Sequence, residues 1–270
     1  MVTERSERAR LPVPVAVRDH GPPGRRFNIL LIADGYPERE LELFAKRVEA
    51  FCRRLFEAAP FDLLHRLINV YRLDLVTPAD AGALGATFGG AGVSHRGRML
   101  TVDESAALRL AAEVLPGTDL VIVQCNRAGY GGSGGRVAVY SAHPRSVEVA
   151  LHEIGHTAFG LGDEYSYPAG DRVADPDAET DWHSGEEPPF PNLTCQLDRG
   201  SLKWGHLVDA ETPLPTTDPT VGVGAFEGGD YHARGVYRPS SDCRMRTIGS
   251  PFCPVCQQQI RALLLQRTYG

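Results

Sequence analysis

The sequence predicts an α/β domain with a twisted, mostly parallel sheet and helices packed against it. Segments 27–34 and 118–125 are short, continuous apolar runs, which are typical of strands buried on both faces of a sheet. Helical patterns separate the strand patterns, and the order along the chain is β-α-β-α-β-β-α. Because parallel strands need a crossover between them, this alternation favours a mostly parallel sheet.

The first elements follow a polar N-terminal segment. Residues 1–26 are rich in Arg and Pro without a period, and they predict an arm or an edge segment. The strand 27–34 comes next, and Pro37 then begins a helix whose apolar residues share one stripe. That stripe contains Leu41, Phe44, Ala45, Val48, Phe51, Cys52 and Leu55. A second strand is expected near Leu67–Leu75.

The next elements bring the chain to its most distinctive helix. The Gly-rich stretch 82–97 predicts a loop, and Asp103 can cap a helix that runs to about Leu115. Residues 118–125 form the third buried strand. The segment Arg136–Ala142 is shorter and alternates in polarity, which favours an edge strand.

The C-terminal part of the chain has a different character. Residues 163–250 are rich in Pro, Gly and Asp and show little periodicity, until a last helix near Pro254–Arg267. A long irregular region is unusual in a compact domain unless it is functional or held by cross-links.

Six cysteines are present, and they fall into two groups. Cys52 and Cys125 lie in apolar patterns and are expected to be buried thiols. The other four are Cys195, Cys243, Cys253 and Cys256. Their crowding predicts either two disulfides or a small metal clip, and their spacing does not choose among the three possible pairings.

The composition excludes several classes of protein. The net charge of −6 argues against nucleic-acid binding, which usually leaves a basic patch. No run reaches the roughly 18 apolar residues that span a bilayer, so no membrane partner is expected. The first 20 residues lack the apolar block of a signal peptide, so the chain as written is expected to be cytoplasmic, or secreted if a signal was removed. The oligomeric state stays open.

The segment 149–165, VALHEIGHTAFGLGDEY, carries the candidate chemistry. His152 and His156 are four residues apart, so on a helix both imidazoles can bind one Zn²⁺. Glu153 lies beside them, placed to take a proton from a water that the metal activates. An apolar stripe on the other side of the helix contains Val147, Leu151, Ile154 and Ala158.

A zinc site of this kind needs a third protein ligand. A break at Gly160-Leu-Gly162 is followed at once by Asp163 and Glu164, and a sharp turn there can bring an acid back to the metal. Asp163 is the first choice for this ligand and Glu164 is the second.

The motif HEIGHTAFGLGDEY resembles the signature of the IgA-peptidase family of zinc metallopeptidases, which are metzincin-like zincins. Other blocks similar to that family, together covering about residues 27–260, are NILLIADGY (28–36), LINVYRLD (67–74), GYGGSG (129–134), KWG (203–205), FEGGDY (226–231), GVYRP (235–239), CRMR (243–246) and FCPVC (252–256). The chain departs from the wider metzincin pattern HExxHxxGxxH, because Gly160 and Asp163 each fall one residue later.

The resemblance implies a zincin-like catalytic domain whose zinc helix lies at the floor of a cleft. Together with the changes of composition after residues 26 and 162, the resemblance gives an arm (1–26) and a two-part catalytic domain (27–270), with an upper part to about residue 162 and a C-terminal subdomain from 163 to 270. It also implies that Met245 sits in a Met-turn beneath the metal without binding it.

These observations together predict a zinc-dependent endopeptidase that acts on peptides or proteins. Glu153 is expected to accept the proton of the attacking water and pass it to the leaving amine. The segment Val137–Tyr140 is expected to pair with an extended substrate as an added strand. Candidate donors to the oxyanion are Tyr165, Tyr231, His232 and Tyr237.

Two alternatives stay open at this point. A zinc amidohydrolase or exopeptidase would cut a small or terminal amide, and a charged pocket near the metal would favour it. A binding protein could keep the zincin fold without turnover, but Glu153 would then have no structural purpose.

Overall fold

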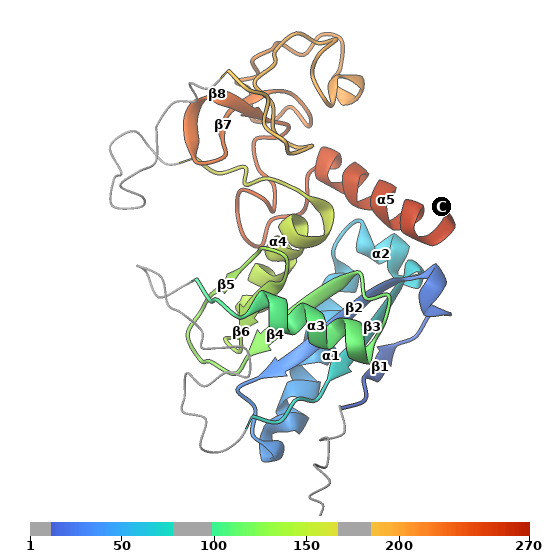
Figure 1. The fold of residues 1–270 in the computed structure, drawn as a ribbon. Helices are drawn as coiled ribbons and strands as arrows, with labels where there is room; N and C mark the ends of the chain where they lie inside the picture. Colours follow the sequence, from blue (N-terminus) through green and yellow to red (C-terminus); the bar gives the residue numbers. More distant parts are fainter. Residues whose placement is uncertain (1–11, 78–98, 167–184) are drawn as a thin grey trace, which may run out of the picture.

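A six-stranded sheet organises the computed structural model, which describes residues 12–77, 99–166 and 185–270. Its strands are β1 (Val15–Arg18), β2 (Phe27–Asp34), β3 (Ile68–Leu73), β4 (Leu120–Cys125), β5 (Gly132–Ser133) and β6 (Ala138–Ser141). They lie in the order β1-β3-β2-β4-β6-β5 (Figure 1). The four central strands are parallel, and β1 and β5 run antiparallel to their neighbours. The predicted α/β class with a mostly parallel sheet is therefore confirmed.

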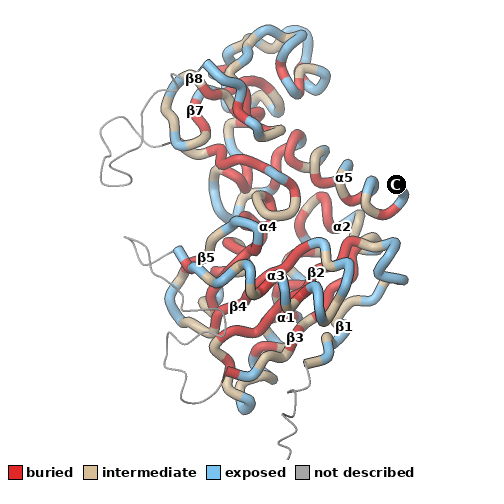
Figure 2. Tube along the Cα trace, in the orientation of Figure 1, coloured by how far each residue is buried: buried red, intermediate tan, exposed pale blue. Residues whose placement is uncertain are grey.

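Helices cover both faces of this sheet, which explains why its strands are apolar on both sides. The α-helices are α1 (Leu41–Glu57), α2 (Phe61–Leu64), α3 (Glu104–Val114), α4 (Ser146–Phe159) and α5 (Pro254–Tyr269). Leu30 and Ile32 of β2 belong to the apolar cluster on the α3 side. Ile29 and Leu31 belong to the larger cluster that contains α1, α4 and α5. All eight residues of β2 are buried, and the central strands stand out accordingly in Figure 2.

The first helices begin and end close to where the sequence predicts. Five members of the predicted α1 stripe are buried: Phe44, Val48, Phe51, Cys52 and Leu55. In α3, the Asp103 side chain accepts a hydrogen bond from the backbone N–H of Ala106 at 2.9 Å, which is the expected N-cap.

The segment Val137–Tyr140 is not an edge strand, contrary to the prediction. Its strand β6 pairs with β4 on one side and with β5 on the other, and the segment is buried throughout. The outermost strand is instead the two-residue β5, formed by Gly132 and Ser133 within the glycine loop. The alternating pattern is misleading because the polar positions of this short strand face other protein segments rather than solvent.

The C-terminal part adds a hairpin and the last helix to this frame. The hairpin consists of β7 (Phe226–Gly229) and β8 (His232–Arg238). Within the described residues, the short 3₁₀ helices are Pro23–Arg25, Glu38–Glu40, His65–Leu67 and Gly205–Leu207. Trp204, Met245 and Phe252 join the main apolar cluster. The predicted loop 82–97 lies outside the described residues.

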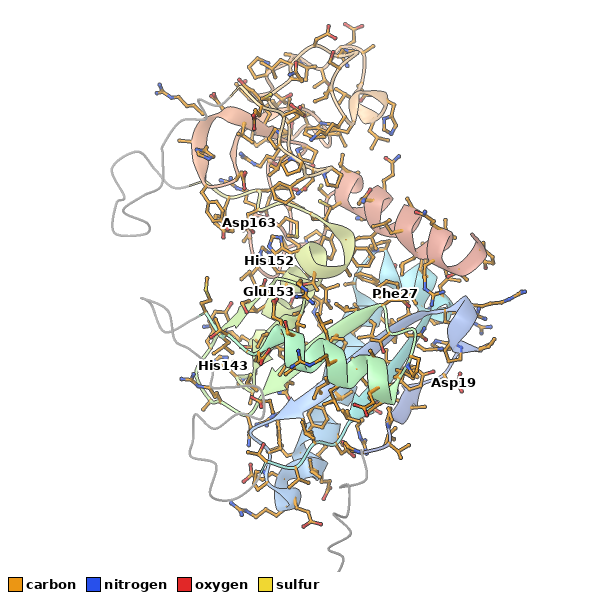
Figure 3. The ribbon with its side chains drawn as sticks, in the orientation of Figure 1. Asp19, Phe27, His143, His152, Glu153 and Asp163 are labelled. Carbon is orange, nitrogen blue, oxygen red and sulfur yellow. The ribbon has the colours of Figure 1, made fainter. Side chains whose placement is uncertain are left out.

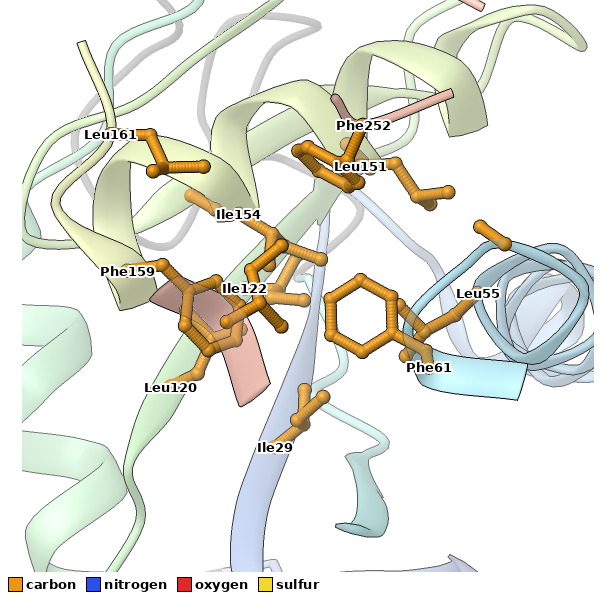
Figure 4. Packing of buried hydrophobic residues seen from close by; sticks show 14 of the residues in the cluster. Ile29, Leu55, Phe61, Leu120, Ile122, Leu151, Ile154, Phe159, Leu161 and Phe252 are labelled. Atoms are coloured by element: carbon orange, nitrogen blue, oxygen red, sulfur yellow. The ribbon is translucent and has the colours of Figure 1, made fainter. Parts of the chain in front are cut away.

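Helix α4 lies between the sheet and the hairpin (Figure 1). Its apolar side carries Leu151, Ile154 and Phe159, which pack near Ile122 of β4 and Phe61 of α2 (Figure 4). Burial of this side fixes the rotation of the helix, so the opposite side, with the histidines, is turned away from the sheet. Among the described residues, no helix is both long and apolar enough to cross a membrane.

Candidate metal centre

A sharp turn after α4 allows two segments of one chain to share a site. Gly160 ends the helix in the left-handed conformation, with φ of 63°, which favours glycine. Backbone hydrogen bonds from Gly160 to His156 and from Leu161 to Gly155 close the last turn. The chain then reverses over the helix and returns Asp163 to the histidines.

Three potential ligand atoms converge beside α4. Oδ1 of Asp163 lies 3.1 Å from Nε2 of His152 and 3.1 Å from Nε2 of His156, and the two Nε2 atoms are 3.1 Å apart. His152 and Asp163 are labelled in Figure 3, where both point into the same region beside Glu153. The structure brings Asp163, and not Glu164, to the histidines: the Glu164 carboxylate points to a separate cluster of cysteines.

The two imidazoles are oriented by hydrogen bonds at Nδ1, the ring nitrogen that faces away from the three converging atoms. Nδ1–H of His152 donates to the backbone carbonyl of Arg244 at 2.9 Å. Nδ1–H of His156 donates to the carbonyl of Leu161 at 2.7 Å. In a neutral imidazole these bonds leave Nε2 with a lone pair, which is the form that binds a metal. Two lone pairs and a carboxylate oxygen therefore face one small volume, and a cation there would relieve their repulsion.

The donor set fits a tetrahedral metal. Nitrogen or oxygen ligands about 2.1 Å from zinc are about 3.4 Å apart at the tetrahedral angle, close to the spacing found here. Oδ1 of Asp163 is buried, and it accepts no well-aligned hydrogen bond from any described residue. A buried charged oxygen left in this way is costly unless a cation compensates it.

The charges of the three groups are strongly coupled. Burial alone would raise the pKa of Asp163, but the interactions with His152 and His156 hold it well below its usual range. Burial alone would lower the pKa of His156, but Asp163 and Glu153 raise it above its usual value. The carboxylate is therefore ionised at neutral pH, as a metal ligand must be.

Glu153 is buried beside the histidines without joining the three candidate ligands. Burial raises its pKa, the nearby histidines partly oppose this, and Asp163 adds to it. The glycine loop lies directly over this carboxylate, because a Cβ atom on Gly134 would come within 2.7 Å of Oε2 of Glu153. Glu153 thus lies between α4 and the sheet edge at β5.

Tyr231 is one of the four predicted oxyanion donors, and it contacts a candidate ligand. Its hydroxyl donates to Oδ2 of Asp163 at 2.6 Å, and its ring packs edge-on against Tyr165 with centroids 5.1 Å apart. Both Asp230 and Tyr231 have positive φ, 48° and 68°, a conformation that costs about 1–3 kcal/mol per residue and is often kept at functional sites. Donation to an oxyanion by Tyr165, Tyr231, His232 or Tyr237 stays a prediction.

Met245 packs against α4, where the family resemblance places a Met-turn. It is fully buried, and a Cβ atom on Gly155 would come within 2.5 Å of its sulfur. Its backbone carbonyl accepts a hydrogen bond from Glu164 N–H at 2.7 Å. Met245 therefore contacts both α4 and the irregular segment that follows this helix.

Two supporting residues were not identified from the sequence. The guanidinium of Arg244 donates to Glu148 at 2.6 Å, which holds the Arg244 carbonyl in place for His152. The Asn192 side chain bonds both backbone groups of Gly162 and also Glu164. Isolated polar residues far apart in the chain give no periodic signal, so these contacts are visible only in three dimensions.

All six cysteines lie in the described ranges and carry free thiols. Of the two alternatives that the sequence left open for the four C-terminal cysteines, the disulfides are therefore not formed. Cys243, Cys253 and Cys256 gather around Glu164, whereas Cys195 is half-buried beside Glu187.

Comparisons with known proteins agree with the resemblance seen in the motif. The sequence model of the family IgA Peptidase M64 matches residues 15–221 and 217–264, which is most of the chain. No curated protein matches the chain. Among solved structures, the chain is similar to the archaemetzincin (amzA) of Methanopyrus kandleri, with 16% identity over 90% of this chain and 98% of that chain and a TM-score of 0.38. The chain belongs to the IgA peptidase M64 family and is a zinc metallopeptidase.

Proposed function

We propose that this peptidase is a zinc-dependent endopeptidase with Zn²⁺ held by His152, His156 and Asp163. The observation that carries the proposal is the convergence of their three ligand atoms, each 3.1 Å from the other two. When bound, zinc acts as a Lewis acid that lowers the pKa of water and polarises the scissile carbonyl. Three protein ligands leave one tetrahedral position open, as catalytic zinc sites require.

In the same proposal, Glu153 is the general base. Its raised pKa keeps its proton affinity higher than that of an exposed glutamate, which suits a group that accepts a proton and later releases it. Glu153 takes the proton of the attacking water and delivers it to the amine of the leaving segment. Tyr231 positions Asp163 through its short hydrogen bond.

Cleavage within a chain, rather than at its end, is supported by the position of the sheet edge. The outermost strand β5 leads directly into Gly134, which lies against Glu153. The outer side of Gly132 is already bridged to Met99, so an extended substrate would follow the edge beyond Gly132, toward Gly134, and would there place a peptide bond beside Glu153. An exopeptidase or a small-amide hydrolase would instead need a closed pocket that recognises a chain end.

The test compares wild type with Glu153→Gln, and with Glu113→Gln on the exposed side of α3 as the matched control. Zinc per chain is measured together with cleavage of an unfolded protein mixture, and the product ends are identified by mass spectrometry. We expect equal zinc in all three proteins, internal cleavage by wild type and control, and a loss of about 10²–10⁴ in kcat/KM for Glu153→Gln.

Other outcomes would contradict particular parts of this proposal. Products shortened only at their termini would replace the endopeptidase with an exopeptidase. Full activity in Glu153→Gln would rule out Glu153 as the general base. Absence of zinc from active wild-type protein would rule out the dependence of catalysis on zinc.

A further inference from the structure

Three thiols and one carboxylate meet at a second place in the molecule. Glu164 lies among Cys243, Cys253 and Cys256, and the four potential ligand atoms are within 4.8 Å of one another. All four residues are buried. None of them belongs to the centre proposed for catalysis.

The distances in this cluster match a tetrahedral zinc site. Sγ of Cys243 lies 3.7 Å from Sγ of Cys256, and Oε1 of Glu164 lies 3.3 Å from the Cys256 sulfur and 3.9 Å from the Cys253 sulfur. Bond lengths of about 2.3 Å for zinc–sulfur and about 2.1 Å for zinc–oxygen imply edges of about 3.8 Å between sulfurs and about 3.6 Å between sulfur and oxygen. A disulfide would need sulfurs about 2.05 Å apart, much closer than these.

The surrounding backbone suits thiolates. Cys253 is the N-cap of α5 and Cys256 lies in its first turn, where the helix dipole favours negative charge. The backbone N–H of Cys253 donates to the Cys243 sulfur at 3.2 Å. Pro254 begins the helix between the two cysteines and fixes the direction of its first turn.

The two oxygens of the Glu164 carboxylate differ in their hydrogen bonding. Asn192 donates to Oε1 at 2.9 Å, and this contact orients the group toward the sulfurs. Oε2 is buried and has no hydrogen-bond partner among the described residues. A buried carboxylate among thiols carries a large desolvation cost that a divalent cation would offset.

We propose that Cys243, Cys253, Cys256 and Glu164 form a second, structural zinc site. Four protein ligands in a buried position leave no place for substrate, which is the mark of a structural centre. The ion would join the start of α5, the turn that contains Met245 and the segment next to Asp163. It would thereby hold the proposed catalytic ligand in position without touching substrate.

The test uses the full chain with His152→Ala and His156→Ala combined, which removes the proposed catalytic centre but leaves the cluster intact. After dialysis against metal-free buffer, we expect about two zinc ions per chain in wild type and about one in this variant. Reconstitution with Co²⁺ should give thiolate-to-cobalt charge-transfer absorption in the near ultraviolet in both proteins. Adding Cys253→Ser should remove the remaining zinc and weaken that absorption, whereas Cys195→Ser, the matched control, should change neither.

The histidine variant keeps the test decisive even if Cys253→Ser does not fold. Loss of all zinc from that variant, with no thiolate charge-transfer absorption, would overturn the proposal. A disulfide between any two of the three cysteines, found by mass spectrometry of unreduced protein, would also overturn it. Failure of the proposed catalytic centre is distinguishable, because wild type would then hold one zinc with the thiolate absorption intact.

Discussion

At the scale of single residues, the candidate metal centre depends on groups that do not contact the metal. The Tyr231 hydroxyl donates a hydrogen bond to Oδ2 of Asp163, and this bond leaves Oδ1 directed at the two histidines. Backbone carbonyls perform the same task for His152 and His156. Such supporting bonds set the protonation and direction of each ligand, and losing one typically weakens metal binding by a factor of 10–100.

The substitution Tyr231→Phe tests this dependence. It removes the hydrogen bond to Asp163 while keeping the ring that packs against Tyr165. We expect zinc affinity at the His152 centre to fall by about 10–100-fold, measured by competition with a chelator of known affinity. Tyr237→Phe is the control, because Tyr237 lies in β8 and its backbone pairs with that of Thr194. The zinc affinity of this control variant should match that of wild type. Unchanged affinity in Tyr231→Phe would show that Asp163 needs no such support.

At the scale of elements, α4 is held at its start as well as along its apolar side. Glu148, in the first turn, receives hydrogen bonds from Arg54 of α1 and from Arg244, whose side chain is almost fully buried. Arg244 also packs its guanidinium over the ring of Phe252, 5.5 Å from the centroid. One ion-pair network thus links α1, α4 and the turn that orients His152.

The substitution Glu148→Gln should reveal this network through the pH dependence of stability. Burial alone would raise the pKa of Glu148, but hydrogen bonds from Arg54 and Arg244 lower it below its usual value of 4.5. Because the folded pKa is depressed, the stabilisation is present above the unfolded pKa and is lost as pH falls through the folded pKa. We expect the free energy of unfolding to be lower by about 1.5–3 kcal/mol in the variant at pH 7, measured by urea denaturation.

The two stability curves should converge as pH falls below the folded pKa of Glu148. Glu42→Gln is the control: Glu42 forms an exposed i,i+4 pair with Lys46 on α1, and no measurable change is expected there. A constant difference between Glu148→Gln and wild type across the pH range would show that the lost stability comes from packing and not from charge.

At the scale of the whole molecule, the irregular C-terminal part is tied to the sheet by a shared core. Trp204, Met245 and Phe252 belong to the same apolar cluster as β2, α1 and α4. The proposed metal ligands come from α4 and from the segment after it, and the groups that position this segment and its ligands come from residues 192, 231 and 244. Binding of metal should therefore stabilise the whole fold rather than one loop.

Removal of metal should lower the stability of the molecule by linkage. A ligand that binds only the folded state adds about 2.7 kcal/mol at a free concentration of 100 times its Kd. We expect chelator-treated protein to unfold at lower urea concentration, and added zinc to restore the midpoint in proportion to the logarithm of its concentration. Calcium at the same concentrations is the control, since nitrogen and sulfur donors bind it poorly. A midpoint independent of zinc would contradict the linkage.

The sequence by itself determined the fold class and the grouping of the two histidines on one face of α4. Apolar runs such as 27–34 identify buried strands, and Asp103 identifies a helix start, because these signals depend only on neighbouring residues. The spacing of His152 and His156 predicted that both imidazoles share a helix face, and the structure places their Nε2 atoms 3.1 Å apart. Family membership follows from blocks along nearly the whole chain.

Only the tertiary structure decided which segments meet. The position of Val137–Tyr140 inside the sheet depends on its pairing with β5, and the alternating pattern of one short strand carries no information about that neighbour. The separation of Asp163 from Glu164 depends on the left-handed turn at Gly160 and on where Asn192 and the cysteines lie. Adjacent acids are equivalent in sequence, but the backbone directs consecutive side chains to different sides, so one carboxylate reaches two histidines and the next reaches three thiols.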